Sequence, residues 1–377
     1  MNELQDIIYF DNAATTNPLP AAVKSASDAL CVYGNPSSVH TAGISAKKII
    51  DSARKTIAAS LFCKPEEIIF TGCGSESNNQ AIYGMAKLRA RRSKRIITTD
   101  SEHPSVALPI ESLAADGFEI VKISTKGGVL DIKSLENELK NGAAFVSVML
   151  ANNETGALYD IAAVRRAIDK SGTQALLHCD AVQGYLKTSD KRVIARNCDL
   201  ASLSAHKIGG LKGVGALYCK SGVKLPAFIR GGGQEGGLRS GTENVAGIAS
   251  FAAASIEYPK HSEHIARLYS LAAEKLSEVE GLKLNIPENR IDTILSVSVS
   301  GVRSEVMLNA LNAKGICISA GSACSARKGP SGTLTAFGLT KSEIEGTVRI
   351  SFGVNNTEQE IITLAQAIDE AAKRLRR

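Results

Sequence analysis

A lysine closely followed by glycines is the strongest chemical feature of this sequence. Lys207 stands in SLSAHKIGGLKGVG (residues 202–215), after the apolar run 199–203, which predicts a buried strand. Glycines let the backbone approach a ligand, and a buried lysine is costly unless it is neutralised or covalently engaged. Lys207 is therefore either an exposed lysine in a glycine turn or an amine that forms a Schiff base with a cofactor such as pyridoxal phosphate (PLP). The order G-x-x-x-x-G-K-[ST] of a Walker-type phosphate loop is absent.

A carboxylate at the end of another apolar run could serve the same cofactor. Asp180 follows the run 175–179 and precedes Lys207 by enough residues for one crossover between strands. A carboxylate in this position can be an ordinary helix cap. Opposite the protonated ring nitrogen of PLP it would instead be well paired. The sequence predicts that Asp180 and Lys207 sit at adjacent strand ends.

A phosphate cradle and a ring-stacking group are also available. Gly74 and Ser75 lie where a strand-like segment passes into a helix-like one. A glycine loop that feeds a helix N-terminus presents free N–H groups and the positive end of the helix dipole to phosphate. His103 follows a further strand-like run, and its flat imidazole can stack on a pyridine ring. A glycine turn and a loop histidine are the ordinary alternatives, so these residues count only in combination.

Two residues near the C-terminus complete the set of reactive side chains. Cys324 lies in a small, polar and basic segment (319–332) that predicts an exposed loop, where Arg327 and Lys328 would favour its thiolate. An incidental surface cysteine is the alternative. Arg349 lies inside an apolar strand-like run and needs a carboxylate partner, which an ordinary salt bridge would supply.

Short motifs in a fixed order run nearly end to end through the chain. They are YFDNAATT (9–16), GNPSS (34–38) followed by His40, SEH (101–103), NNETG (152–156), DAVQ (180–183), SAHK (204–207), RSGT (239–242), GSAC (321–324) and VRIS (348–351). Each fragment is weak, but their ordered occurrence is specific. In these motifs the sequence resembles the cysteine desulfurases of the NifS/IscS type, within the class-V aminotransferase-like PLP enzymes.

The resemblance implies an enzyme that converts L-cysteine to L-alanine and passes the sulfur on. Cys324, Lys207 and His103 would be catalytic: Lys207 removes the substrate α-proton, His103 shuttles protons at the substrate thiol, and Cys324 attacks the sulfur to form a persulfide. The residues implied to bind PLP are Lys207, Asp180, Gln183, His103, Gly74, Ser75, Ser204, His206, Asn153 and, from the neighbouring subunit, Thr242. Arg349, Asn35 and Asn153 would bind the substrate, with Arg349 as a bidentate clamp on its carboxylate.

The rhythm of apolar segments predicts an α/β fold. Seven short strands alternate with helical segments between residues 67 and 218, which indicates a mainly parallel seven-stranded sheet with helices on both faces. Ligands of such sheets bind at the carboxyl ends of the strands, where the predicted site residues fall. The resemblance names this a fold type I PLP-dependent transferase. We expect a large PLP-binding domain (16–257) and a smaller α+β domain (1–15 and 258–377) that carries the cysteine loop.

Composition narrows the possible partners. A net charge of +6 in 377 residues is mild, and no basic stretch is interleaved with aromatic residues, so nothing predicts nucleic-acid binding. The eight cysteines form no C-x-x-C pair, so no metal site is expected. No signal pattern or membrane-spanning run is visible, which predicts a cytoplasmic protein with reduced thiols. The resemblance adds a homodimer and a sulfur-acceptor protein, either an iron–sulfur scaffold or a tRNA-thiolation protein.

Three alternative functions remain open at this point. A selenocysteine lyase would use the same groups on a selenium substrate. Another class-V aminotransferase-like enzyme would not need the thiol of Cys324. A non-catalytic sulfur-relay scaffold would not need Lys207 and Asp180.

Overall fold

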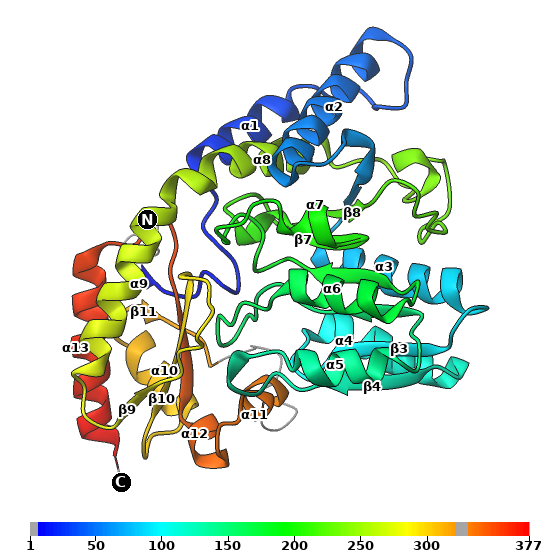
Figure 1. Ribbon diagram of the computed structural model, residues 1–377. Coiled ribbons are helices and arrows are strands. Elements are labelled where there is room, and N and C mark those ends of the chain that lie inside the picture. The colour runs from blue at the N-terminus through cyan, green and yellow to red at the C-terminus, as the bar shows by residue number, and fades with distance from the viewer. Residues whose placement is uncertain (1–6, 321–330, 377) are drawn as a thin grey trace.

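The largest element of the structure is a seven-stranded sheet (Figure 1). The computed structural model describes residues 7–320 and 331–376. The strand order is β2-β8-β7-β6-β5-β3-β4, and β8 alone runs against its two neighbours. The strands are β2 (Ile68–Thr71), β3 (Arg95–Thr99), β4 (Glu119–Ile123), β5 (Phe145–Ser147), β6 (Leu176–Asp180), β7 (Leu200–Ser204) and β8 (Gly215–Cys219). The predicted mainly parallel seven-stranded sheet is confirmed.

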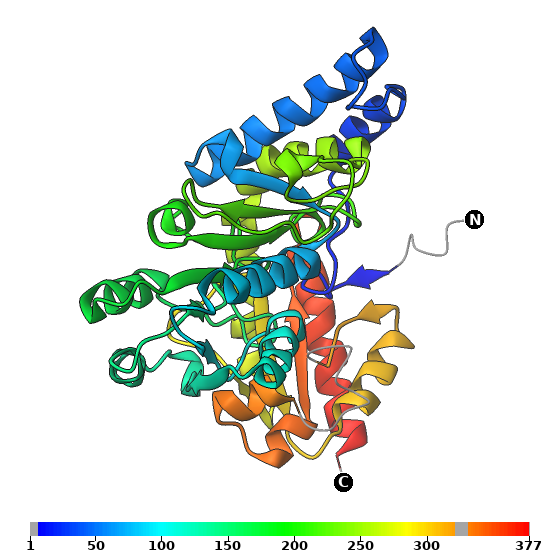
Figure 2. The same cartoon turned by 90° about the vertical axis from the view of Figure 1, so that its right-hand side faces the viewer.

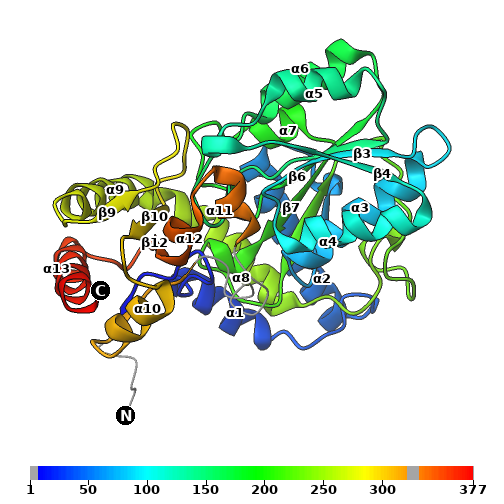
Figure 3. The same ribbon diagram turned by 90° about the horizontal axis from the view of Figure 1, so that it is seen from below.

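Consecutive residues of each strand bury opposite faces of this sheet. Leu176 packs in the apolar cluster that contains Ile82 of α3 (Gly74–Arg89), whereas Leu177 packs in the cluster that contains Val164 of α6 (Ile161–Ser171). Side chains alternate along a strand, so a parallel strand that is covered on both faces must be apolar at every position. Seen from below, α3 and α4 (Pro104–Ser112) lie on one side of the sheet and α5 (Ile132–Leu139) and α6 on the other (Figure 3).

A smaller α/β unit packs beside the carboxyl ends of these strands. Its sheet has the order β12-β10-β9 and is antiparallel, and helices α9, α10 and α13 accompany it (Figure 1). The elements are α9 (Ser262–Ser277), β9 (Leu282–Leu284), β10 (Ile294–Val299), α10 (Ser304–Asn312), β12 (Thr347–Ser351) and α13 (Glu358–Leu375). Between them come β11 (Ile316–Cys317), α11 (Gly332–Phe337) and α12 (Lys341–Glu345).

The N-terminal segment joins this smaller unit. Strand β1 (Ile8–Tyr9) pairs in parallel with β11, and Ser351 N–H donates to the Phe10 carbonyl. These contacts place residues 8–10 beside the smaller unit. The domain boundaries themselves stay a prediction.

Three helices form a separate layer at the far end of the large sheet. Helices α1 (Pro20–Leu30), α2 (Thr41–Leu61) and α8 (Val245–Glu257) pack together, and α2 reaches outward beyond the rest of the chain (Figure 2). The short α7 (Val193–Asn197) precedes β7. Apolar side chains at the tip of this layer are exposed: Leu30, Tyr33, Val39 and Ile44. Within residues 7–320 and 331–376, no helix is long and apolar enough to cross a membrane.

Candidate active site

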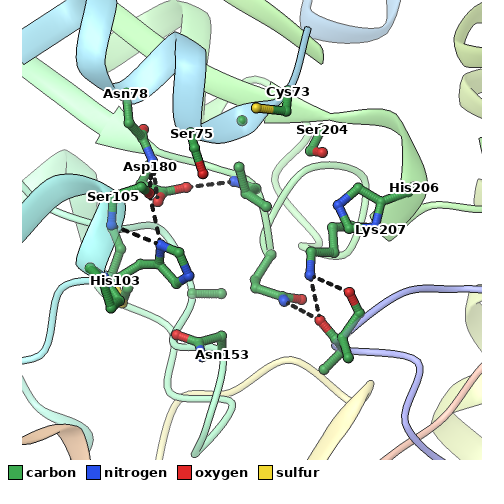
Figure 4. Close-up of a pocket in the computed structure, with 18 of the residues that line it drawn as sticks. Cys73, Ser75, Asn78, His103, Ser105, Asn153, Asp180, Ser204, His206 and Lys207 are labelled. Atoms are coloured by element: carbon green, nitrogen blue, oxygen red, sulfur yellow. Dashed lines mark hydrogen bonds between the residues drawn. The ribbon is translucent and has the colours of Figure 1, made fainter. Parts of the chain in front are cut away.

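A cavity of about 320 Å³ lies at the carboxyl ends of the parallel strands. Strand β2 runs the same way as β7, because β8 is antiparallel to both, so the loops after β2, β3, β5, β6 and β7 all meet at this edge. The polar side chains around it include Ser75, Asn78, His103, Asn153, Asp180, Ser204, His206 and Lys207 (Figure 4). Gln183 and Arg349 also line the cavity. The cavity therefore brings together most of the residues predicted from separate motifs.

Lys207 reaches into the cavity from the turn that follows β7. Its Nζ donates to the carbonyl oxygens of Ala13 and Ala14, at 2.7 and 2.8 Å. Burial lowers the pKa of Lys207 to about 8, with a further lowering by Arg349 that the carboxylates Asp11 and Asp180 oppose. A lysine with this pKa has a usable fraction of neutral, nucleophilic amine near neutral pH.

Asp180 lies at the end of β6, the neighbour of β7, as predicted. Its carboxylate is buried and accepts hydrogen bonds from Val182 N–H (3.0 Å) and from Asn78 Nδ2 (2.8 Å). Among the described residues no cation forms an ion pair with it. A buried carboxylate favours a charged hydrogen-bond donor, and a protonated pyridine nitrogen is such a donor.

His103 is connected to Asp180 through two side chains that the motif analysis did not single out. Asn78 Nδ2 also donates to Ser105 Oγ (2.8 Å), which lies 2.7 Å from His103 Nδ1. Ser105 N–H points at the same nitrogen, so Nδ1 is an acceptor and the ring proton of neutral His103 is on Nε2. Asn78 could have been found from its spacing, since it lies one helical turn after Gly74.

Burial decides the protonation of the two cavity histidines. Burial lowers the pKa of His103. The nearby negative charge of Asp180 raises this pKa, and the positive charge of Lys207 lowers it. His206 has its pKa lowered to about 4, by burial and by the nearby lysines. The lowered pKa values favour the neutral form of both imidazoles, in which one ring nitrogen accepts and the other donates a hydrogen bond.

The start of α3 and the end of β7 form a concave polar surface. The first N–H groups of a helix have no intrahelical acceptor, and here they begin at Gly74. Ser204 Oγ is buried and has no hydrogen-bond partner within the described part of the chain. A Cβ at Gly74 would come within 2.6 Å of Val182 Cγ2, so only glycine fits there. An unpaired hydroxyl beside a free helix N-terminus fits a phosphate group, and the cavity as a whole fits PLP.

Arg349 is buried at the other side of the cavity, on β12. Its Nη1 donates to the Asn153 carbonyl (2.7 Å) and its Nη2 to Asp11 Oδ1 (2.8 Å). Arg349 Nε has no partner within the described part of the chain. The guanidinium thus has donors left for a substrate carboxylate. Asp11, like Asn78 and Ser105, had no role predicted from the sequence motifs.

Two predicted residues do not line this cavity. Asn35 and Thr242 are exposed and do not line it, and the Asn35 side chain accepts from Ser37 N–H instead. Cys324 lies outside the described residues. The predicted roles of all three stay predictions.

The amino-acid sequence matches the model of the family "Aminotransferase class-V" over residues 8–364. The chain belongs to the class-V aminotransferase family. It is 36% identical to a cysteine desulfurase of Trichormus azollae, with 98% of this chain and 94% of the relative covered, and 35% identical to a cysteine desulfurase IscS of Methanosarcina thermophila, with 98% and 93% covered. The family inferred from the ordered motifs is confirmed.

Solved structures agree with these sequence matches. A NifS-like protein superimposes with a TM-score of 0.90 at 34% identity, covering 98% of this chain and all of that one. The protein SspA, solved in complex with cysteine, has a TM-score of 0.82 at 31% identity and covers 93% of this chain. The predicted fold class is confirmed, and the family to which the chain belongs is one of PLP-dependent enzymes.

Proposed function

We propose that this protein is a PLP-dependent cysteine desulfurase. The observation that carries the proposal is that two groups line the same cavity: Lys207, whose pKa is lowered, and the buried carboxylate of Asp180, with which no cation of the described residues forms an ion pair. A lysine amine and a pyridinium partner are the two groups that PLP requires. The names of the relatives over nearly the whole chain support cysteine as the substrate.

In this proposal the described residues hold PLP at four points. Asp180 binds the ring nitrogen, His103 lies against the ring, and Gln183 donates to the ring hydroxyl oxygen. The N-terminus of α3 at Gly74 and Ser75, with Ser204 and His206, binds the phosphate. When bound, PLP supplies an electron sink for the carbon from which a proton is removed.

The remaining groups act on the substrate. Arg349 binds the α-carboxylate of cysteine, with the Asn153 side chain beside it. Lys207, in the neutral form that its lowered pKa makes accessible, accepts the proton from the α-carbon. His103 Nε2–H faces the substrate thiol and donates a hydrogen bond to its sulfur. The Cys324 thiolate attacks the substrate sulfur as the bond from that sulfur to the β-carbon breaks, so that a persulfide forms on Cys324, and the carbon skeleton leaves as alanine once its α- and β-carbons have been protonated.

We further propose that two chains form a homodimer. Asn35 and Thr242 do not line the cavity of their own chain, and exposed apolar side chains gather at the tip of the α1–α2 layer. A partner chain would cover this tip and bring Thr242 to the neighbouring phosphate site. Sulfur would then pass from Cys324 to an acceptor protein, an iron–sulfur scaffold or a tRNA-thiolation protein.

The substitution Cys324→Ser tests the desulfurase reaction. Wild-type protein given limiting cysteine should gain one sulfur atom on the peptide that contains Cys324 and release alanine. Cys324→Ser should still bind PLP but release alanine at least about 100-fold more slowly, because a hydroxyl is a poor nucleophile toward sulfur. Cys31→Ser, at an exposed cysteine outside the cavity, is the matched control and should behave as wild type. Wild-type turnover by Cys324→Ser would contradict the mechanism.

A further inference from the structure

A second lysine lies behind the cavity and contacts one of its polar residues. Lys187 does not line the cavity, but its Nζ donates to Gln183 Oε1 at 3.3 Å. Gln183 is itself buried, and its Nε2 donates to the Ala13 carbonyl at 2.9 Å. The same carbonyl accepts from Lys207. Lys187 is therefore linked to Lys207 through one amide and one carbonyl.

The two partners of Gln183 determine how its amide is oriented. A lysine ammonium is only a donor and a backbone carbonyl is only an acceptor. If the amide were turned over while Lys187 is protonated, its NH2 group would face the ammonium and its oxygen would face the Ala13 carbonyl, and both contacts would be repulsive. In the observed orientation one Nε2 hydrogen binds Ala13 and the other is free for a ligand in the cavity.

The backbone holds Lys187 in this position despite two unfavourable features. Leu186 has a φ of 61°, in the left-handed region that costs a residue with a side chain about 1 kcal/mol or more. Among the described residues no carboxylate forms an ion pair with Lys187, and burial, with the charges of Lys207 and Arg349, lowers the pKa of Lys187 to about 7. Strained backbone that persists beside a binding site suggests a functional reason.

We propose that Lys187 is a positioning residue, which orients the Gln183 amide so that it presents an N–H donor to the ring-hydroxyl side of the bound cofactor. The inference deepens the proposed function, because it assumes that the cavity binds PLP. It assigns Lys187 no contact with PLP or substrate. Apart from its charge near His206, to which Lys212 also contributes, its effect should pass through Gln183.

A double-mutant cycle on PLP binding tests this proposal. Lys187→Met removes the donor and keeps a long apolar stem, and it should raise the PLP dissociation constant about tenfold, the loss expected for one hydrogen bond. It should also shift the visible absorbance maximum of bound PLP. Lys187→Arg retains a donor and should restore most of the affinity. In a Gln183→Ala background, Lys187→Met should have no further effect.

The control is Lys212→Met, which removes an exposed lysine that makes no contact with Gln183. It changes the net charge by the same amount and should alter PLP affinity less than twofold. Unchanged affinity and absorbance in Lys187→Met, or an equal tenfold loss in the Gln183→Ala background, would overturn the inference. If Lys187→Met does not fold, Lys187→Ala replaces it, because alanine also removes the donor to Gln183 Oε1. Failure of the wild-type protein to bind PLP would instead contradict the proposed function.

Discussion

The rate at which the Lys207 amine reacts with PLP should depend on pH, because burial lowers the pKa of this amine. Only the neutral amine is nucleophilic, and burial with Arg349 lowers the pKa of Lys207 to about 8. With that pKa about 9% of the amine is neutral at pH 7, against about 0.03% for an ordinary lysine. At equal intrinsic reactivity, Lys207 should therefore react roughly 300-fold faster than a free lysine side chain at pH 7.

The assay mixes ligand-free protein with excess PLP across a pH series and traps the product with borohydride. Peptide mass then gives the labelled fraction at Lys207, and a blocked lysine derivative measured in parallel corrects for the titration of PLP itself. The corrected rate should rise with pH and level off above a midpoint near pH 8. A midpoint close to that of free lysine, or a label on another lysine, would refute the reasoning.

Arg349→Gln separates the two causes of the lowered pKa. Arg349 is the largest charge effect on Lys207, and its removal also leaves the Asp11 carboxylate unpaired, which favours the ammonium form. The midpoint should move upward, and the rate at pH 7 should fall. Lys212→Met removes a lysine that is not among the causes of this pKa and should leave the midpoint in place. An unshifted midpoint in Arg349→Gln would mean that burial alone sets the reactivity.

Two further predictions concern stability and assembly. His178 is buried between Ser147 and Ser202, and burial lowers its pKa to about 3, so the unfolded chain binds a proton that the folded chain does not once pH falls below about 6.5. Wild-type protein should therefore lose about 2 kcal/mol more unfolding free energy between pH 7 and pH 5 than His178→Asn does, measured by urea titration. For assembly, sedimentation at micromolar concentration should show two chains, and Thr242→Ala should weaken PLP binding about tenfold although Thr242 lies outside its own cavity. A monomer whose affinity Thr242→Ala leaves unchanged would contradict the dimer.

The sequence alone was sufficient for the sheet and for most of the site. Apolar runs that end in Asp180 and in the segment before Lys207 predicted two buried strands, and parallel strands bring their carboxyl ends to one edge. Gly74 and His103 follow β2 and β3, which run in the same direction as β6 and β7, so both residues lie at the same edge of the sheet. These placements are local, because a strand end determines where the next few residues lie.

Contacts between segments far apart in the chain were decided only by the tertiary structure. The Asp180–Asn78–Ser105–His103 network joins three elements, and no motif contains all four residues. Its formation depends on how α3 and α4 pack on the sheet, which periodicity does not determine.

The same holds for the two charged groups whose partners the sequence could not name. Arg349 needed a carboxylate, and the pairing of the N-terminal segment with the smaller unit supplies Asp11, 338 residues away. No sequence motif indicated a role for Lys187, and the folded chain, left-handed at Leu186, brings its Nζ to Gln183 Oε1. Strand ends follow from the pattern of apolar residues, whereas such pairings require the folded chain, because hydrogen bonds and charges act over a few ångströms in space and not along the sequence.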